Sequence, residues 1–103
     1  MYAVIFRAEV GDQDQEYSDT AAKMRELAIS QYGCLEFIAV TEGDQEIAIS
    51  YWPDEASILA WKQDVQHRQA QQQGQARWYK SYQVQVVKVK REYSFPNAGA
   101  CHA

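Results

Sequence analysis

The stretch LEFIAVTEGDQEIAISYWPDE, residues 35–55, predicts a β-hairpin followed by the first turn of a helix. Residues 35–41 and 45–52 are apolar runs of the length that is typical of strands. Between them stands Glu42-Gly43-Asp44, a short link with glycine and aspartate that favours a hairpin turn. Pro53-Asp54-Glu55 then closes the second strand and provides residues that favour the start of a helix.

On the amino-terminal side of this hairpin, the sequence predicts one strand and one helix. From Tyr2 to Val10 the side chains alternate between the two faces that a strand presents. From Gln13 to Tyr32 apolar residues recur every three or four positions, which is the period of an amphipathic helix. Asp14 suits the start of this helix, and Gly33 is placed to end it.

On the carboxyl-terminal side, the sequence predicts two helical segments and a last strand. The helix that opens at residues 53–55 has an apolar stripe that includes Trp61. The polar segment from Gln66 to Gln75 consists largely of helix formers and predicts a second short, mostly exposed helix. Tyr79 to Tyr93 predicts a long strand with apolar groups on both faces, and residues 94–103 predict a flexible tail.

The order of these elements, β-α-β-β-α-β, predicts an α+β domain of the ferredoxin-like type over residues 1–93. Four antiparallel strands with the helices on one face leave the other face of the sheet uncovered. Much of that face is apolar, so we expect two copies to pack sheet against sheet as a homodimer. The long last strand would reach beyond its own sheet and could pair across the interface.

Composition narrows the class of protein. The chain of 103 residues suffices for one domain. Fourteen acidic against ten basic residues give a formal charge of −4. This charge argues against a nucleic acid partner, because phosphate binding needs a concentrated basic surface. No run approaches the roughly 20 apolar residues of a membrane span, and no signal-peptide pattern opens the chain, so we expect a cytoplasmic protein without a membrane partner.

The cysteines and histidines form no metal or disulfide motif. Cys34 and Cys101 are far apart and belong to no CxxC pattern, and Cys34 is expected to be a buried small hydrophobe rather than a reactive thiol. His67 and His102 are also far apart. We therefore expect no metal site.

The second half of the chain carries a series of aromatic and polar motifs, namely Tyr51-Trp52 to Glu55, Trp61, His67-Arg68, Ala70-Gln71, Gly74, Trp78-Tyr79, Tyr82 and Arg91-Glu92-Tyr93. This series resembles a bacterial subgroup of the antibiotic biosynthesis monooxygenase (ABM) superfamily, and the resemblance spans roughly residues 1–93. It implies a dimeric α/β barrel in which each subunit holds a pocket between its sheet and its helices. It also implies a choice of activities, because the superfamily includes cofactor-independent oxygenases that convert phenolic polyketides to quinones and monooxygenases that degrade haem.

The sequence does not contain the residue pattern that the haem-degrading members of the superfamily share. These members share an asparagine on the first strand, a tryptophan on the second helix and a haem-ligating histidine about ten residues after it. Trp61 matches the tryptophan, but Arg7 stands nearest to the asparagine position and Gln71 occupies the histidine position. His67 follows Trp61 by only six residues, and the sole asparagine is Asn97 in the tail. Haem degradation is therefore not expected, and neither is any other cofactor.

His67 and Trp61 are the candidates for catalytic groups. An unperturbed imidazole titrates near pH 6.5, so His67 could take the proton of a phenol, or it could simply bond to a neighbour on the helix surface. Trp61 could border a pocket or belong to the core. Arg7 could bind a substrate carboxylate or phenolate if it faces the pocket. If it faces the dimer interface instead, it would pair with an acidic residue such as Glu36 or Glu9.

Four further aromatic residues are candidates for substrate binding, and they could equally pack between subunits: Trp52, Trp78, Tyr79 and Tyr82. Two hypotheses for the function remain. The first is a cofactor-independent monooxygenase that acts on a small planar aromatic compound, such as a phenol or quinol. The second is a non-catalytic dimeric protein that binds a small ligand or acts in stress, because the asparagine of the quinone-forming oxygenases is missing from residues 1–93.

Overall fold

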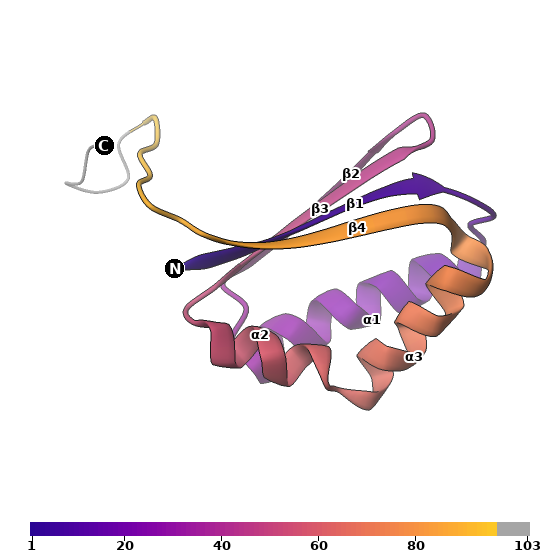
Figure 1. Ribbon diagram of the computed structural model, residues 1–103, viewed down its shortest axis with the longest axis horizontal. Coiled ribbons are helices and arrows are strands. Elements are labelled where there is room, and N and C mark those ends of the chain that lie inside the picture. Colours follow the sequence, from indigo (N-terminus) through magenta and orange to yellow (C-terminus); the bar gives the residue numbers. More distant parts are fainter. Residues whose placement is uncertain (97–103) are drawn as a thin grey trace.

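The computed structural model describes residues 1–96, without the side chain of Val65 (Figure 1). The predicted tail residues Asn97, Cys101 and His102 therefore lie outside the described residues. The elements in chain order are β1 (Tyr2–Val10), α1 (Gln15–Tyr32), β2 (Glu36–Glu42), β3 (Gln45–Trp52), α2 (Glu55–Lys62), α3 (Val65–Gln73), the π-helical turn η1 (Gly74–Trp78) and β4 (Tyr79–Lys88).

The four strands form one antiparallel sheet in the order β2-β3-β1-β4. The two central strands are β1 and β3, and the helices lie together on one face of the sheet (Figure 1). This arrangement confirms the predicted α+β, ferredoxin-like βαββαβ fold. None of the helices in residues 1–96 is both long enough and apolar enough to span a bilayer.

Short polar residues start the helices, and glycine ends the longest one. The carboxylate of Asp14 accepts a hydrogen bond from the backbone N–H of Tyr17 at 2.9 Å, so α1 begins at Gln15, two residues later than predicted. Gly33 ends this helix in the left-handed region, with φ of 77°, where a side chain would be strained. Asp54 caps α2 in the same way through the N–H of Ser57.

The core lies between the sheet and the helices. Trp52 at the end of β3 is fully buried, and it packs with Val4, Ala28, Cys34, Ile58 and Trp61. Cys34 is a free, buried thiol, which confirms its interpretation as a small core hydrophobe. Burial raises the pKa of this thiol, so it stays protonated and is a poor nucleophile.

The last strand is shorter than predicted. β4 ends at Lys88, which pairs with Tyr2 at the very start of β1, and only one further backbone bond, from Val89 N–H to the carbonyl of Met1, extends the ladder. β1 begins at Tyr2, so the ladder between β1 and β4 ends here. The following residues up to Pro96 run away from the sheet (Figure 1). The prediction of a strand up to Tyr93 was therefore wrong for the single protomer.

The face of the sheet that points away from the helices, here called the outer face, has an apolar centre on β1, β2 and β3, whereas β4 also presents Gln83 and Gln85 there. Strand alternation places on it Ile5, Arg7, Ile38, Val40, Ile47, Ile49 and Val87. Val40 is 61% exposed and Ile38 is 46% exposed. Scattered exposed apolar residues are ordinary, but a contiguous apolar sheet face is typical of a contact surface.

Candidate functional site

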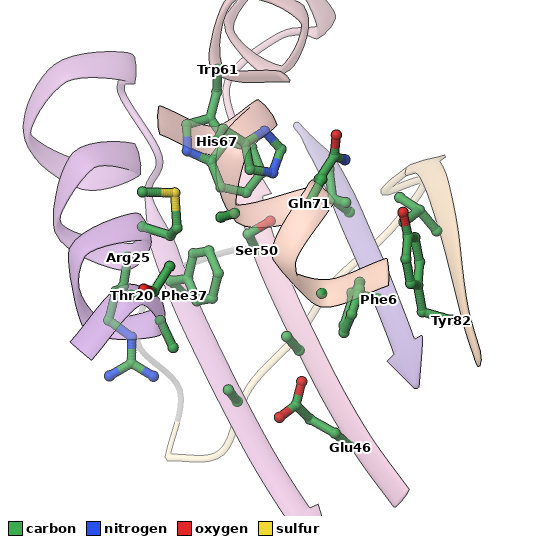
Figure 2. Close-up of a pocket in the computed structure, with 18 of the residues that line it drawn as sticks. Phe6, Thr20, Arg25, Phe37, Glu46, Ser50, Trp61, His67, Gln71 and Tyr82 are labelled. Atoms are coloured by element: carbon green, nitrogen blue, oxygen red, sulfur yellow. The ribbon is translucent and has the colours of Figure 1, made fainter. Parts of the chain in front are cut away.

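A cavity of about 700 Å³ lies between the sheet and the helices (Figure 2). Its size is in the range of pockets that hold small organic molecules. Its walls are mainly apolar side chains of all four strands and of α1, among them Val4, Phe6, Ala39, Val84 and Val86. Polar side chains line this wall near His67, near Glu46 and on α1, where Figure 2 shows Thr20 and Arg25 beside Phe37.

At the first of these places, the imidazole of His67 stacks on the indole of Trp61. The ring centroids are 3.9 Å apart and the planes are inclined by 17°. Trp61 stands in the last turn of α2 and His67 in the first turn of α3, and Asp64 lies between the two helices. Asp64 caps α3 through the backbone N–H of His67 and also accepts a hydrogen bond of 2.6 Å from the hydroxyl of Tyr32. These bonds fix the direction in which α3 leaves α2, and with it the stack.

The surroundings of His67 favour its neutral form. Burial lowers the pKa of the imidazole below its ordinary value of 6.5, although the nearby carbonyls of Lys62 and Trp61 and the charge of Asp64 oppose this shift. The imidazole is therefore neutral at pH 7 and has a lone pair available for a proton. Nδ1 is buried and has no hydrogen-bond partner within the described residues.

At the second place, the buried carboxylate of Glu46 accepts hydrogen bonds from two tyrosines. Tyr17 on α1 donates its hydroxyl hydrogen to Oε1, and Tyr79 at the start of β4 donates to Oε2 at 2.8 Å. The two hydroxyl oxygens are 3.1 Å apart. All three side chains line the cavity, and Glu46 is only 6% exposed. We call these three residues the Glu46 cluster.

Burial and the neighbouring carboxylate keep both phenols protonated. Burial first, and then the hydrogen bond to Glu46, raises the pKa of Tyr17 to about 12. The pKa of Tyr79 is also raised, by burial and by its contacts with Tyr17 and Glu46. The tyrosines therefore keep their hydroxyl hydrogens and donate them to the Glu46 side chain.

This shift predicts a loss of stability in alkali. Because Tyr17 titrates near 10 when unfolded and about 12 when folded, its contribution is complete below pH 10 and disappears as the pH rises through 12. We expect the free energy of unfolding, measured by urea denaturation, to fall between about pH 10 and pH 12. The fall should be smaller in Tyr17→Phe and unchanged in Tyr93→Phe, whose side chain is exposed. An equal fall in all three proteins would contradict the prediction.

Aromatic rings connect the Glu46 cluster to the middle of the cavity. Phe6 packs edge-on against Tyr79, with centroids 5.2 Å apart, and is stacked on Tyr82 at 5.4 Å. Tyr17 packs edge-on against Trp78 at 5.5 Å. Trp78 belongs to η1, and such π-helical turns occur often at functional sites.

The structure brings most of the predicted site residues together. Those that line the cavity are Trp61, His67, Trp78, Tyr79 and Tyr82. Trp52 does not line it, because it lies fully buried below Trp61, at 5.2 Å between ring centroids, and donates its indole N–H to Ser50 Oγ at 2.8 Å. Trp52 is therefore a core residue in this fold.

Arg7 lies apart from the cavity. It pairs with Ile47 and Gln83 across the sheet and shares the outer face with them, whereas its neighbours Phe6 and Ala8 point toward the helices. The expectation that Arg7 binds substrate in this cavity is corrected by the alternation of the strand. Within one protomer, the described residues give Arg7 no ion-pair partner.

Sequence reasoning missed Tyr17 and Glu46 as site residues. A signal for Glu46 was available, because it stands in phase with Ala48, Ser50 and Trp52 and so belongs to the inward face of β3. A charged residue in phase with an apolar face is uncommon and points to a paired or functional group. No comparable signal exists for Tyr17, which is one of many tyrosines in the chain.

The described part of the chain contains no group of three or more histidine, cysteine, aspartate or glutamate side chains that could hold a metal ion.

Comparisons with known proteins find a family model and a curated relative that match most of the chain. A sequence model described as "Antibiotic biosynthesis monooxygenase" (ABM) matches residues 1–73. The chain is 39% identical over 95 residues to "Uncharacterized protein YqjZ" of Bacillus subtilis (strain 168), a match that covers 91% of this chain and 83% of that protein.

Solved structures show the same fold at low sequence identity. SnoaB, a cofactor-independent oxygenase from Streptomyces nogalater, matches with a TM-score of 0.75 and 13% identity, over 93% of this chain and 97% of SnoaB. A conserved protein from Methanosarcina mazei Go1 matches with a TM-score of 0.75 and 15% identity, over 86% of this chain and 92% of that one.

Proposed function

Because this chain belongs to the antibiotic biosynthesis monooxygenase family, we propose that it is a cofactor-independent monooxygenase for a small planar phenol- or quinol-like compound. The observation that carries the proposal is the stack of a neutral His67 on Trp61 in the wall of an apolar cavity. A flat aromatic ligand suits such walls, and a neutral imidazole beside it can accept the phenolic proton. The fold shared with the oxygenase SnoaB supports the reaction class.

In the proposed reaction His67 acts as a general base. With Nδ1 enclosed, Nε2 is the nitrogen that takes the phenolic proton. The phenolate transfers one electron to O2, and the two radicals join at the ring carbon opposite the phenolic oxygen. That carbon then passes its hydrogen, as a proton, to the outer oxygen while the O–O bond breaks, and the hydroxide that leaves takes the proton from His67. The phenol and O2 thus give a quinone and one water.

Trp61 would position the substrate in this scheme. Its indole already holds the imidazole in a stacked geometry, so a ring that enters the cavity meets both groups together. Trp78, Tyr79 and Tyr82 would line the path of the ligand away from His67. These roles make the aromatic residues binding groups rather than proton carriers.

The test is oxygen uptake by the purified protein with a panel of phenols and 1-naphthols that carry hydrogen on the ring carbon opposite the hydroxyl, in the presence of a chelator and without added flavin. We expect one O2 consumed for each quinone formed, with no hydrogen peroxide released. The second candidate function is ligand binding without turnover, which the absence of asparagine from residues 1–93 favours. Compounds that raise the melting temperature but are not consumed in air would support binding alone and contradict the oxygenase.

We also propose that the protein is a homodimer joined through the outer face. Packing two such faces together would remove Val40, Ile38 and Ile47 from water, and these are now between 41% and 61% exposed. Arg7 would then lie in the interface, where an acidic residue of the second copy could pair with it. Residues 89–96 follow β4 and run away from the sheet (Figure 1), and we expect them to contact the second copy.

A further inference from the structure

The Glu46 cluster requires an explanation that packing does not give. A carboxylate buried between a sheet and helices loses its hydration, and replacing such groups with apolar residues is often neutral or stabilising. Here the carboxylate stands on the inward face of β3, in phase with Ala48 and Ser50, and two tyrosines from α1 and β4 converge on it. Three separate elements thus place polar groups on the wall of a cavity whose lining is mainly apolar.

The Glu46 cluster has lone pairs that its own hydrogen bonds do not use. An ionised carboxylate offers about four lone-pair positions, and Tyr17 and Tyr79 use two of them. The phenolic oxygens add further lone pairs, while their hydrogens are already engaged. The cluster therefore presents acceptors and a negative charge to the cavity, so it attracts a group that carries a hydrogen and repels an anion.

The cluster lies at the opposite end of the cavity from His67. Glu46 and Ser50 are four residues apart on the same face of β3, which corresponds to about 13 Å along a strand. Figure 2 shows Ser50 beneath Trp61 and His67, and Glu46 at the far end beyond Phe6. The cavity is thus elongated. The imidazole of His67 lies near one end, the carboxylate of Glu46 lies near the other, and aromatic side chains line the walls between them.

We propose that the Glu46 cluster is a second binding site for the ligand, which accepts a hydrogen bond from a hydroxyl group at the end of the planar ring system farthest from His67. The ligand is then a planar aromatic with hydroxyls at both ends, rather than a simple phenol. This inference rests on the proposed function, since it assumes that a planar phenol occupies the cavity. In this proposal Glu46 binds a hydroxyl group of the ligand, and His67 remains the group that accepts the phenolic proton.

The test is a set of three naphthalenes with the same first hydroxyl and a different group at the far end: 2-naphthol, 2,6-dihydroxynaphthalene and 6-hydroxy-2-naphthoate. Dissociation constants are measured by calorimetry under nitrogen, so that binding is separated from oxygenation. We expect the diol to bind about tenfold or more tightly than 2-naphthol, because hydrogen bonds to charged groups are the strong ones. The naphthoate should bind more weakly than either.

Glu46→Gln is the decisive variant, because glutamine keeps the shape and removes the charge. The preference for the diol should fall to nearly one, while the affinity for 2-naphthol stays the same. Glu42→Gln is the matched control, since it removes a charge from the same hairpin on an exposed side chain, and it should keep the full preference. Equal preference for the diol in Glu46→Gln and the wild type would overturn the proposal.

Tyr17→Phe provides a second test if Glu46→Gln does not fold. It leaves the carboxylate with one donor fewer, so the far hydroxyl of the diol should replace the lost phenol. The diol should then raise the melting temperature more in Tyr17→Phe than in the wild type, and 2-naphthol should not. A purely structural cluster predicts no difference between the two compounds, which would overturn the second site.

The two proposals fail in different ways. Oxygen consumption without any preference for the diol would overturn the second site and leave the oxygenase intact. A diol preference that depends on Glu46, without oxygen consumption, would support the second site and leave a binding protein. If none of the three naphthalenes bound to the wild type, both proposals would be wrong, since both require a planar phenol in the cavity.

Discussion

His67→Gln is expected to slow oxygen consumption by about 10²–10⁴-fold, the usual contribution of a general base. Glutamine has a similar reach and can form hydrogen bonds, but it cannot accept a proton near pH 7. The substrate should still bind, because the aromatic walls of the cavity and Trp61 are unchanged. The loss should therefore appear mainly in kcat, and the oxygen electrode together with calorimetric binding separates the two effects.

The pH dependence of the wild type gives the same residue a second signature. Burial lowers the pKa of His67, and the base is active only when it is unprotonated. Activity should therefore persist below pH 6.5 and fall only when the acidity passes the lowered pKa. A histidine in water would instead lose half of its activity near pH 6.5.

Arg68→Gln is the matched control for His67→Gln, because it alters the next residue of α3, whose side chain is exposed. It should keep the rate and the pH profile of the wild type. A His67→Gln protein that is folded and as active as the wild type would show that another group takes the proton.

Ile47→Lys is expected to convert the proposed dimer into a monomer. Ile47 lies on β3, a central strand, and its neighbours on the outer face are Val40 on β2 and Arg7 on β1. In a two-fold interface the substitution would bury two ammonium groups, each of which costs several kcal/mol in lost hydration. Light scattering should report twice the chain mass of 11.8 kDa for the wild type and a single chain for the variant.

Leu59→Lys controls for the added charge. Leu59 is an exposed apolar residue of α2, 54% accessible, and it does not lie on the sheet. This variant should remain a dimer. A wild type that is monomeric at micromolar concentration, or an Ile47→Lys variant that is still dimeric, would contradict the proposed interface.

Local patterns in the chain determined the elements and their order. The ranges Tyr2–Val10 and Gln45–Trp52 match the strands to the residue, because alternation and the flanking turn residues act over a few positions. The end of β4 was mispredicted, because apolar residues continue to Val89 while the partner strand does not. Strand length depends on available backbone in the neighbour, and a single segment carries no information about that.

The candidate site, too, was predicted in part from local sequence patterns and was decided in part only by the tertiary structure. Histidine and tryptophan six residues apart stood out in the sequence, yet six residues would put them on different faces of one continuous helix. They stack because the chain turns at Asp64, between α2 and α3. Arg7 was open between two faces until the register of β1 with β3 assigned it to the outer one.

By itself, the sequence determined which residues form strands and helices, that one sheet face is apolar, and that aromatic residues accompany His67. Only the tertiary structure decided that Tyr17, Glu46 and Tyr79 meet, since they come from α1, β3 and β4. Hydrophobic periodicity is read within about one turn or a few strand residues. Contacts between distant elements depend on how the sheet is ordered and how the helices pack on it, and no local pattern contains these.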